Sequence, residues 1–451
     1  MIKKFNYIDG KINKINTNYY YTNFQKKKLC RYPETSVSLS KKIILSANKG
    51  FAINKNLSEN QRYLSFSKII NYLKKNSDQI AKYECIETGK KFENAKKEIN
   101  SGIEYWIAAQ KLIKKKNIFK TKKNIDIISE PIGVVLLFIP WNYPFIVLCE
   151  RLPFILAAGC GVIIKPSEFA ATSLDFVVKA MKKSVFLRRS INVVYGSGKK
   201  IGSYLVKSNG IDMISFTRST DTAKKIISDS SKGSLKKLSL ELGGKNPIIV
   251  NDLFSIKKNI RSITEIIMEN GGQACIGGSL LYVNSKIYEK FKEYISRELD
   301  LLKDYQYPVR KNIRNSHYNR LNVNKIFYGK ENMRSKFNKP ILVENLDSKN
   351  IINKKEIFSP LVSLKKFSSI KKLIYNLNEN DYGLAIYLFT KEKKQIEFFK
   401  KNIRYGRVWI NSSLKKWDTN APIGGFRNSG YGQETSIIGL NNYRVFKTIV
   451  N

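Results

Sequence analysis

The chain has 451 residues, which is enough for about two or three domains with a large core. Its hydrophobic fraction of 42% is ordinary for a globular protein, but its net charge of +45 is not. The lysines are scattered along the whole sequence among many asparagines and isoleucines, and they form no basic arm. This pattern favours a compositional bias over selection for phosphate contacts, so no specific nucleic-acid binding is expected.

The five cysteines show no CxxC or CxH spacing, so the sequence predicts no metal site. Their odd number and scattered positions fit free thiols in a reducing cytosol. The first residues lack the apolar segment of a secretory signal. The uncharged stretch 131–149 contains Pro131, Pro140 and Pro144, which favour a buried strand, a turn and a helix start over a membrane span. We therefore expect a cytoplasmic protein without a membrane segment.

Apolar residues at helical spacing predict helices over residues 57–115. Beyond residue 130, short apolar runs alternate with helical segments. The predicted strands are 132–139, 161–165, 191–195, 212–216 and 235–240, and the predicted helices are 145–158, 171–184, one that starts near Gly198, and 221–230. Continuous apolar strands that alternate with helices indicate a parallel, doubly wound α/β sheet.

A second α/β unit is expected from about residue 243 to residue 418, with strands at 247–250, 280–283, 361–367, 385–389 and 407–411. Residues 118–129 predict a β-hairpin, and the tail 443–450 predicts an isolated strand. Because an unpaired strand edge invites pairing, we expect the hairpin and the tail to project and to pair with a partner subunit.

Polar or glycine-rich segments follow the strands of the first sheet. They are Pro140-Trp141-Asn142, Lys165-Pro166-Ser167-Glu168, Gly196-Ser197-Gly198, Phe216-Thr217-Arg218-Ser219 and Glu241-Leu242-Gly243-Gly244. Doubly wound sheets bind ligands beyond the carboxyl ends of their strands, so these segments are expected to form one rim. A glycine-rich turn that opens a helix, as at Gly198, can face a pyrophosphate.

Three residues in specific frames can carry acyl chemistry. Asn142 lies in Pro140-Trp141-Asn142-Tyr143-Pro144, Glu241 in Glu241-Leu242-Gly243-Gly244-Lys245, and Cys275 in Gly272-Gln273-Ala274-Cys275. A thiolate can attack a carbonyl carbon, a carboxamide can donate to the resulting oxyanion, and a carboxylate can activate water. This set needs no histidine, and the chain has only one.

These frames, in this order and spacing, resemble the NAD(P)-dependent aldehyde dehydrogenase superfamily over nearly the whole chain, and the block from Pro422 to Gly432 resembles it too. The resemblance implies a doubly wound dinucleotide-binding domain, a second α/β catalytic domain and a small β oligomerisation element. It assigns 1–117 and 130–241 to NAD binding, 242–418 to the catalytic domain, and 118–129 with 419–451 to oligomerisation in a homodimer or homotetramer.

The mechanism that the resemblance implies starts with attack of the Cys275 thiolate on an aldehyde. The thiohemiacetal loses hydride to the nicotinamide, and Glu241 activates the water that hydrolyses the thioester to a carboxylic acid. The side chain of Asn142 and the backbone N–H of Cys275 would hold the oxyanion. Two alternatives stay open: a CoA-acylating relative, against which Glu241 argues, and a catalytically impaired basic binding or scaffold protein on the same fold.

The resemblance also implies the cofactor contacts. Lys165 and Glu168 would bind the adenosine ribose, and Glu168 would repel a 2′-phosphate, which favours NAD over NADP. Ser219 resembles the serine that contacts the pyrophosphate, and Glu356 and Phe358 resemble the pair that holds the nicotinamide ribose and ring. The full expected set is Pro140, Trp141, Lys165, Ser167, Glu168, Gly198, Gly202, Phe216, Ser219, Leu242, Glu356 and Phe358.

Several positions depart from the family pattern. Arg218 stands where the family usually has glycine, and Ser359 replaces another common glycine. The stretch between Cys275 and Glu356 is shorter than usual, and its middle, residues 305–324, matches poorly. Glu150 and Arg151 fall near the expected substrate funnel, which leaves room for an ionic substrate group. Semialdehydes such as succinic semialdehyde, simple aliphatic aldehydes and amino aldehydes all remain open.

Overall fold

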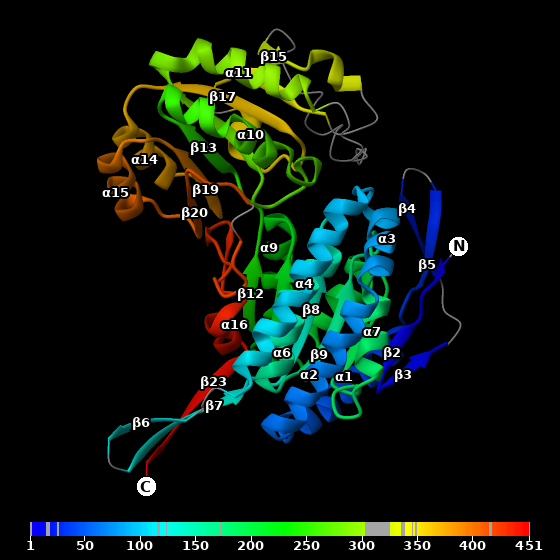
Figure 1. Ribbon diagram of the computed structural model, residues 1–451. Coiled ribbons are helices and arrows are strands. Elements are labelled where there is room, and N and C mark those ends of the chain that lie inside the picture. The colour runs from blue at the N-terminus through cyan, green and yellow to red at the C-terminus, as the bar shows by residue number, and fades with distance from the viewer. Residues whose placement is uncertain are drawn as a thin grey trace. The chain divides into compact units, whose positions relative to one another are not determined.

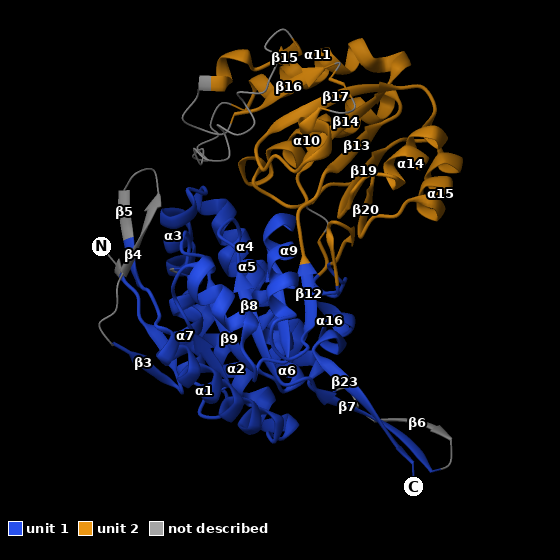
Figure 2. Cartoon of the chain, turned by 180° about the vertical axis from the view of Figure 1, so that it is seen from behind, with its two compact units in different colours: residues 1–240, 419–423, 432–451 blue, residues 241–418, 424–431 orange. Residues whose placement is uncertain are grey.

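The computed structural model describes residues 2–14, 19–24, 27–114, 118–122, 124–171, 173–302, 325–334, 339–344, 346–347, 350–414 and 417–450. The poorly matching stretch 305–324 lies outside these residues. The chain forms two compact units (Figure 2). Unit 1 comprises Met1–Leu240, Thr419–Ile423 and Gly432–Asn451, and unit 2 comprises Glu241–Asp418 and Gly424–Tyr431.

Unit 1 begins with short strands that lead into a series of helices. The strands are β1 (Ile2–Lys3), β2 (Asn6–Ile8), β3 (Lys11–Asn13), β4 (Tyr19–Phe24) and β5 (Lys27–Pro33). The helices are α1 (Val37–Lys55), α2 (Glu59–Lys75), α3 (Ser77–Thr88) and α4 (Phe92–Leu112). The helical periodicity over residues 57–115 is confirmed by α2, α3 and α4, whereas α1 and the strands before it were not expected.

The main sheet of unit 1 contains the predicted parallel strands. They are β8 (Val134–Ile139), β9 (Gly161–Pro166), β10 (Ile191–Val193), β11 (Met213–Thr217) and β12 (Lys237–Glu241). The order within this unit is β12-β11-β8-β9-β10-β2-β3. β11, β8, β9 and β10 run parallel, and β2 joins antiparallel to β10. Nearly every residue of β8 and β9 is buried, so both faces of the sheet are covered (Figure 1).

The connecting helices of unit 1 differ from the prediction at one place. They are α5 (Pro144–Cys149), α6 (Leu152–Ala158), α7 (Leu174–Lys182), the π-helical turn η1 (Gly198–Gly202), α8 (Ser203–Lys207) and α9 (Thr220–Ser230). The expectation of one helix over 145–158 is wrong. The helix is interrupted at Arg151, whose φ of −123° is not helical. Pro153 then lies in the first turn of α6, where its missing N–H costs no hydrogen bond.

The hairpin and the C-terminal strand of unit 1 form one small sheet. Its strands are β6 (Ile118–Lys122), β7 (Ile125–Pro131) and β23 (Arg444–Val450), and α16 (Ser436–Asn442) precedes β23. The hairpin is confirmed. The tail is not an isolated strand, because β23 pairs antiparallel with β7 of the same chain from Arg444 to Val450. β7 and β23 project from the rest of unit 1 (Figure 1).

Unit 2 contains a second parallel sheet, in the order β15-β16-β17-β14-β13-β19-β20. The strands are β13 (Asn246–Val250), β14 (Gly278–Asn284), β15 (Ile326–Tyr328), β16 (Ile341–Glu344), β17 (Leu361–Phe367), β19 (Ala385–Phe389) and β20 (Arg407–Ile410). Only β15 pairs antiparallel among these strands. The predicted strands 361–367 and 385–389 are confirmed to the residue.

Helices pack on both faces of the sheet in unit 2 (Figure 1). Their bounds are α10 (Leu253–Met268), α11 (Tyr288–Asp300), α13 (Ile351–Lys354), α14 (Ile370–Asn378) and α15 (Lys393–Asn402). Ile248 and Val250 of β13 pack with α10 and α11, whereas Ile249 packs with α14 and α15. Alternate strand residues point to opposite faces, so this arrangement explains why the strand reads as a continuous apolar run.

Two kinds of feature are absent from the described residues. None of their helices has an apolar stretch long enough to cross a bilayer. None of their His, Cys, Asp and Glu side chains gather in threes as a metal site would require.

Close packing of α1 on β9 gives a test of the fold of unit 1. A Cβ at Gly161 would lie 2.5 Å from the carbonyl oxygen of Ala47 and 2.9 Å from the Cβ of Phe51. Gly161→Ala should therefore lower the free energy of unfolding by about 1–3 kcal/mol, measured by chemical denaturation. Gly198→Ala is the control, because nothing lies within 4 Å of its added Cβ. Equal destabilisation by both substitutions would contradict the packing.

Candidate active site

The loop that carries Cys275 depends on backbone conformations that few residues tolerate. Between α10 and β14, φ is 49° at Asn270, 63° at Gly271 and 74° at Gly272. A Cβ at Gly272 would lie 2.2 Å from the backbone nitrogen of Pro360, so glycine is required there. Cys275, at the end of this loop, is partly exposed, whereas Cys149 and the remaining cysteines other than Cys85 are buried. Cys275 is therefore one of the two cysteines that the fold does not bury.

Asn246, at the start of β13, holds this loop on the sheet. Its Nδ2 donates to the carbonyl oxygens of Cys275 and Gly277, at 2.7 and 2.9 Å. Its Oδ1 accepts the backbone N–H of Ala385 in β19, at 3.1 Å. The side chain is fully buried. No role for Asn246 was expected from the sequence, and its place directly after Glu241-Leu242-Gly243-Gly244-Lys245 was the only available signal.

The segment after Glu241 packs closely against both Cys275 and Glu356. The N–H of Gly244 donates to Glu356 Oε1 at 3.1 Å. A Cβ at Gly243 would lie 2.3 Å from Glu356 Oε2, and one at Gly244 would lie 2.7 Å from the carbonyl oxygen of Cys275. The two glycines thus allow the Cys275 loop and Glu356 to approach the segment that follows Glu241 within unit 2.

Two further predicted residues extend this part of unit 2. Leu242 is buried, and its N–H donates to the carbonyl oxygen of Ser429 at 3.0 Å. Phe358, two residues after Glu356, has a left-handed φ of 57°. A non-glycine residue in this conformation is uncommon and is favoured where the surroundings hold the backbone in place.

Two buried groups beside Glu241 titrate near neutrality. Burial raises the pKa of Glu356 to about 8; the charge of Glu241 adds to the rise, while the N–H of Gly244 and the charge of Lys245 oppose it. Burial lowers the pKa of Lys245 to about 7, and Glu356 opposes that shift. Among the described residues, Lys245 Nζ has no hydrogen-bond partner. Strongly shifted groups of this kind gather at functional sites.

Charged side chains also gather at the carboxyl end of β9 in unit 1. Lys165 Nζ lies 3.8 Å from the Glu168 carboxylate. Burial lowers the pKa of Lys165, and Arg218 lowers it further, whereas Glu168 and Glu34 oppose the shift. Arg218 is thus close enough to act on this site electrostatically. Glu34, which accepts the N–H of Ser197 at 3.3 Å, was not expected because no motif surrounds it.

The glycine-rich turn leaves open space beside these charges. Ser197 caps η1 by accepting the N–H of Lys200 at 3.2 Å. An added Cβ at Gly198 would meet nothing within 4 Å, and one at Gly202 would lie 3.6 Å from Lys165 Cε. Ser219 is the N-cap residue of α9. Ser167 follows β9 and Phe216 lies near the end of β11, on the two strands that flank β8 in this sheet, and both are buried.

Asn142 follows β8 on the same sheet, in the turn before α5. Asn142, Trp141 and Pro140 are all buried, and Asn142 is 8% exposed. The structure therefore groups the predicted residues within each unit. Asn142, the expected oxyanion donor, and the residues expected to bind the adenosine belong to unit 1, and Cys275, Glu241 and Glu356 belong to unit 2.

Glu150 and Arg151, which the sequence placed near the substrate funnel, belong to a buried network. Arg151 Nη1 donates to Glu150 Oε2 at 3.0 Å, and its Nε lies 3.9 Å from Glu434 Oε1. Glu434 also accepts hydroxyl hydrogen bonds from Ser239 and Tyr443. These charges are paired with one another inside the protein and so give no support for an ionic substrate group at this place.

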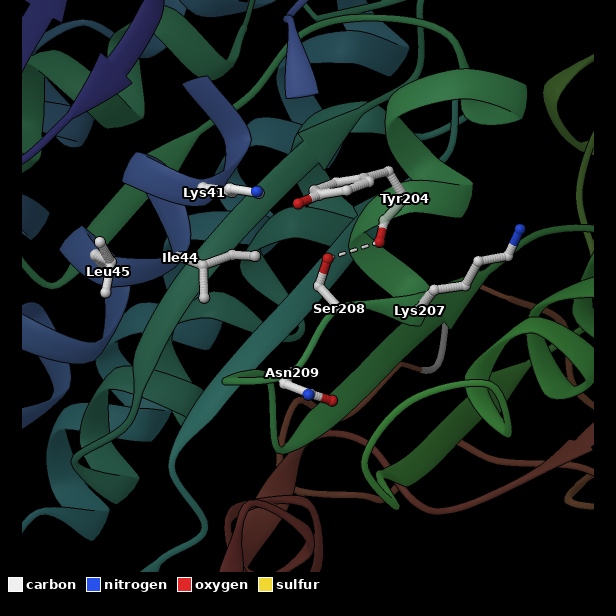
Figure 3. Close-up of a pocket in the computed structure, with 7 residues that line it drawn as sticks. All are labelled: Lys41, Ile44, Leu45, Tyr204, Lys207, Ser208 and Asn209. Atoms are coloured by element: carbon white, nitrogen blue, oxygen red, sulfur yellow. Dashed lines mark hydrogen bonds between the residues drawn. The ribbon is translucent and has the colours of Figure 1, made fainter. Parts of the chain in front are cut away.

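A groove on unit 1 contains none of the predicted residues. It is lined by Lys41, Ile44, Leu45, Tyr204, Lys207, Ser208 and Asn209, which come from α1 and from α8 with the residues after it (Figure 3). The hydroxyl of Ser208 donates to the backbone carbonyl of Tyr204 at 2.7 Å. The groove holds no cysteine and no carboxylate, so it offers neither the nucleophile nor the base of the predicted chemistry.

The clamp made by Asn246 can be tested directly. Asn246→Ala removes the donor to two backbone carbonyls and the acceptor of a third backbone group, each worth about 1–3 kcal/mol when left unpaired. We expect a lower denaturation midpoint and a changed rate of Cys275 alkylation by iodoacetamide. Asn259→Ala is the control, because Asn259 is also buried but donates only within its own helix. An unchanged alkylation rate in Asn246→Ala would refute the clamp.

Comparison with known proteins identifies the family of this chain. The model of the aldehyde dehydrogenase family matches residues 13–449. Aldehyde dehydrogenase [NAD(P)+] 2 of Saccharomyces cerevisiae is 32% identical over 87% of this chain and 83% of its own length. Succinate-semialdehyde dehydrogenase [NADP(+)] of the same yeast is 27% identical over 93% of this chain and 89% of its own length.

A solved structure agrees with the sequence comparisons. Betaine aldehyde dehydrogenase from Staphylococcus aureus, in complex with NAD+, superimposes with a TM-score of 0.92 and 26% identity, over 99% of this chain and 94% of that one. The chain therefore belongs to the aldehyde dehydrogenase family, and it is an oxidoreductase with a nicotinamide dinucleotide as cofactor.

Proposed function

We propose that this enzyme oxidises an aldehyde to a carboxylic acid through a covalent intermediate on Cys275. The observation that carries the proposal is the packing of the partly exposed Cys275 loop against the segment after Glu241, through Asn246 and Gly244. This packing supports a thiol nucleophile and a carboxylate base that act at one carbonyl carbon.

In the proposed mechanism each residue has one role. The Cys275 thiolate forms a bond to the aldehyde carbon, and the oxyanion accepts hydrogen bonds from the Asn142 amide and the Cys275 backbone N–H. Bound nicotinamide supplies the acceptor for the hydride that leaves this carbon. Glu241 then takes a proton from water, whose oxygen attacks the thioester and releases the carboxylic acid and the thiol.

The residues of unit 1 fit a dinucleotide. The open space at Gly198 lets a phosphate approach the backbone, and Lys165 and Glu168 offer a cation and a carboxylate for ribose hydroxyls. We propose NAD as the preferred form, because the Glu168 carboxylate would repel a 2′-phosphate. In unit 2, Glu356 would accept hydrogen bonds from the nicotinamide ribose, and Phe358 and Leu242 would contact the ring.

Hydrolysis is favoured over acyl transfer to CoA because Glu241 supplies a base that a thiol acceptor would not need. We place dinucleotide binding in 1–117 and 130–241, catalysis in 242–418, and oligomer contacts in 118–129 and 419–451. The exposed side chains of Phe446 and Val450 on β23 support a homo-oligomer, and five free cysteines support a reducing cytoplasm.

The aldehyde itself is best sought with a panel. Formation of NADH is followed by absorbance with aliphatic aldehydes, amino aldehydes and succinic semialdehyde, and with NADP in parallel. Cys275→Ala should lower kcat at least about a thousandfold, because it removes the covalent route. Cys85→Ala, at the other partly exposed cysteine, should retain full activity. Full turnover by Cys275→Ala would disprove the mechanism.

The raised pKa of Glu356 predicts how cofactor affinity varies with pH. Above about pH 8 the carboxyl group is ionised and accepts hydrogen bonds from hydroxyls more strongly, so NAD should bind more tightly as the pH rises through 8. Below that pH the group is neutral and the gain is lost. Glu356→Gln should flatten this step in the dissociation constant, measured by fluorescence titration. A step that persists in Glu356→Gln would show that another group causes it.

A further inference from the structure

A buried charged cluster lies beside the turn that carries Asn142. Lys90, two residues after α3, has a side chain that is 0% exposed. Its Nζ lies 3.8 Å from Glu84 Oε1 and forms an ion pair with Glu98 of α4. The same Nζ lies 4.1 Å from the centroid of the Tyr143 ring. Tyr143 is the chain neighbour of Asn142, so the cluster reaches the turn directly.

Burying the charges of this cluster costs free energy, so other interactions must offset that cost. The side chain of Glu84 is 0% exposed and that of Glu98 is 15% exposed. Charges withdrawn from water to this degree are retained when each is compensated, and an ammonium over an aromatic face gains most when it is desolvated. Lys90 meets both conditions. The carboxylates of Glu84 and Glu98 compensate the charge of its ammonium, and the ammonium lies over the Tyr143 ring.

Residues on both sides of the turn act electrostatically on Glu84. Burial raises the pKa of Glu84, while Lys90, the Ser173 hydroxyl and the backbone N–H of Phe145 oppose the rise. Phe145 is in the first turn of α5, where backbone N–H groups have no partner inside the helix. α5 has no side-chain cap of its own.

Helix α4 packs against α5, the helix that follows the turn. An added Cβ at Gly102 would lie 2.7 Å from Phe145 Cε1 and 3.2 Å from Cys149 Sγ. α4 and α5 are therefore in close contact, and α5 cannot move toward α4. The turn is thus contacted at Tyr143 by Lys90, and α5, which follows it, is packed against α4 at Gly102.

We propose that Lys90 is a positioning residue for the oxyanion site: held by Glu84 and Glu98, its ammonium fixes the Tyr143 ring and thereby the side chain of Asn142. The inference rests on the proposed function only for the role of Asn142 in the reaction. The structural part, that Lys90 fixes the turn, can be tested without any activity.

Hydrogen exchange tests the structural part. Lys90→Met keeps an unbranched side chain, one atom shorter, and removes its charge. It should speed amide exchange in residues 141–149 by about tenfold, since the local hydrogen bonds open more often. Lys91→Met is the matched control, because Lys91 is the exposed neighbour. If Lys90→Met does not fold, Tyr143→Leu removes the ring and should speed the same exchange. Unchanged exchange at 141–149 would overturn the proposal.

Kinetics test the catalytic part. Lys90→Met should lower kcat about tenfold with little change in KM, because a displaced donor weakens the transition state more than substrate binding. Lys90→Arg, which keeps the charge, should recover part of the loss. In a double-mutant cycle with Asn142→Ala, the loss of kcat in the double variant should be smaller than the product of the two single losses.

The two measurements separate the possible failures. Multiplicative losses in the cycle would show that Lys90 acts elsewhere and would overturn the proposal. A wild-type enzyme that oxidises no aldehyde would refute the proposed function, and the hydrogen-exchange comparison would still decide whether Lys90 fixes the turn.

Discussion

The side-chain amide of Asn246 joins three segments of unit 2 that lie far apart in the sequence. It donates to Cys275 and Gly277 and accepts from Ala385. Only an amide can donate twice and accept once in this position, because a carboxylate only accepts and an apolar side chain does neither. Since Asn246 is also the first residue of β13, the backbone of the Cys275 loop is tied to the parallel sheet.

The electrostatics of unit 2 depend on this packing. Gly243 and Gly244 have no side chains, which lets Glu356 approach the segment that begins at Glu241. Burial then moves the pKa values of Glu356 and Lys245 toward neutrality, where proton transfer is easiest. The buried charges around Arg151 and Glu434 differ, because serine and tyrosine hydroxyls and opposite charges satisfy them. That network links the segment between α5 and α6 to β12 and to the residues on either side of α16.

The sequence patterns revealed the elements in which one kind of residue dominates. β17 and β19 are continuous apolar runs, and both were predicted to the residue. α1 was missed because its buried face includes Ser40, Ser46, Gly50 and Asn54, which break the apolar periodicity. The motifs identified Cys275, Glu241 and Glu356, which the fold brings together within unit 2. Glu34, Lys90 and Asn246 gained their roles only from contacts that the fold creates.

The central claim is that Cys275 forms a thioester that Glu241 resolves. The most direct measurement is a rapid-mix experiment on Glu241→Gln with excess aldehyde and NAD. The account predicts a burst of about one NADH per Cys275, followed by slow turnover, and an acyl adduct on Cys275 by mass spectrometry after an acid quench. Steady turnover at the wild-type rate, with no burst and no adduct, would contradict it.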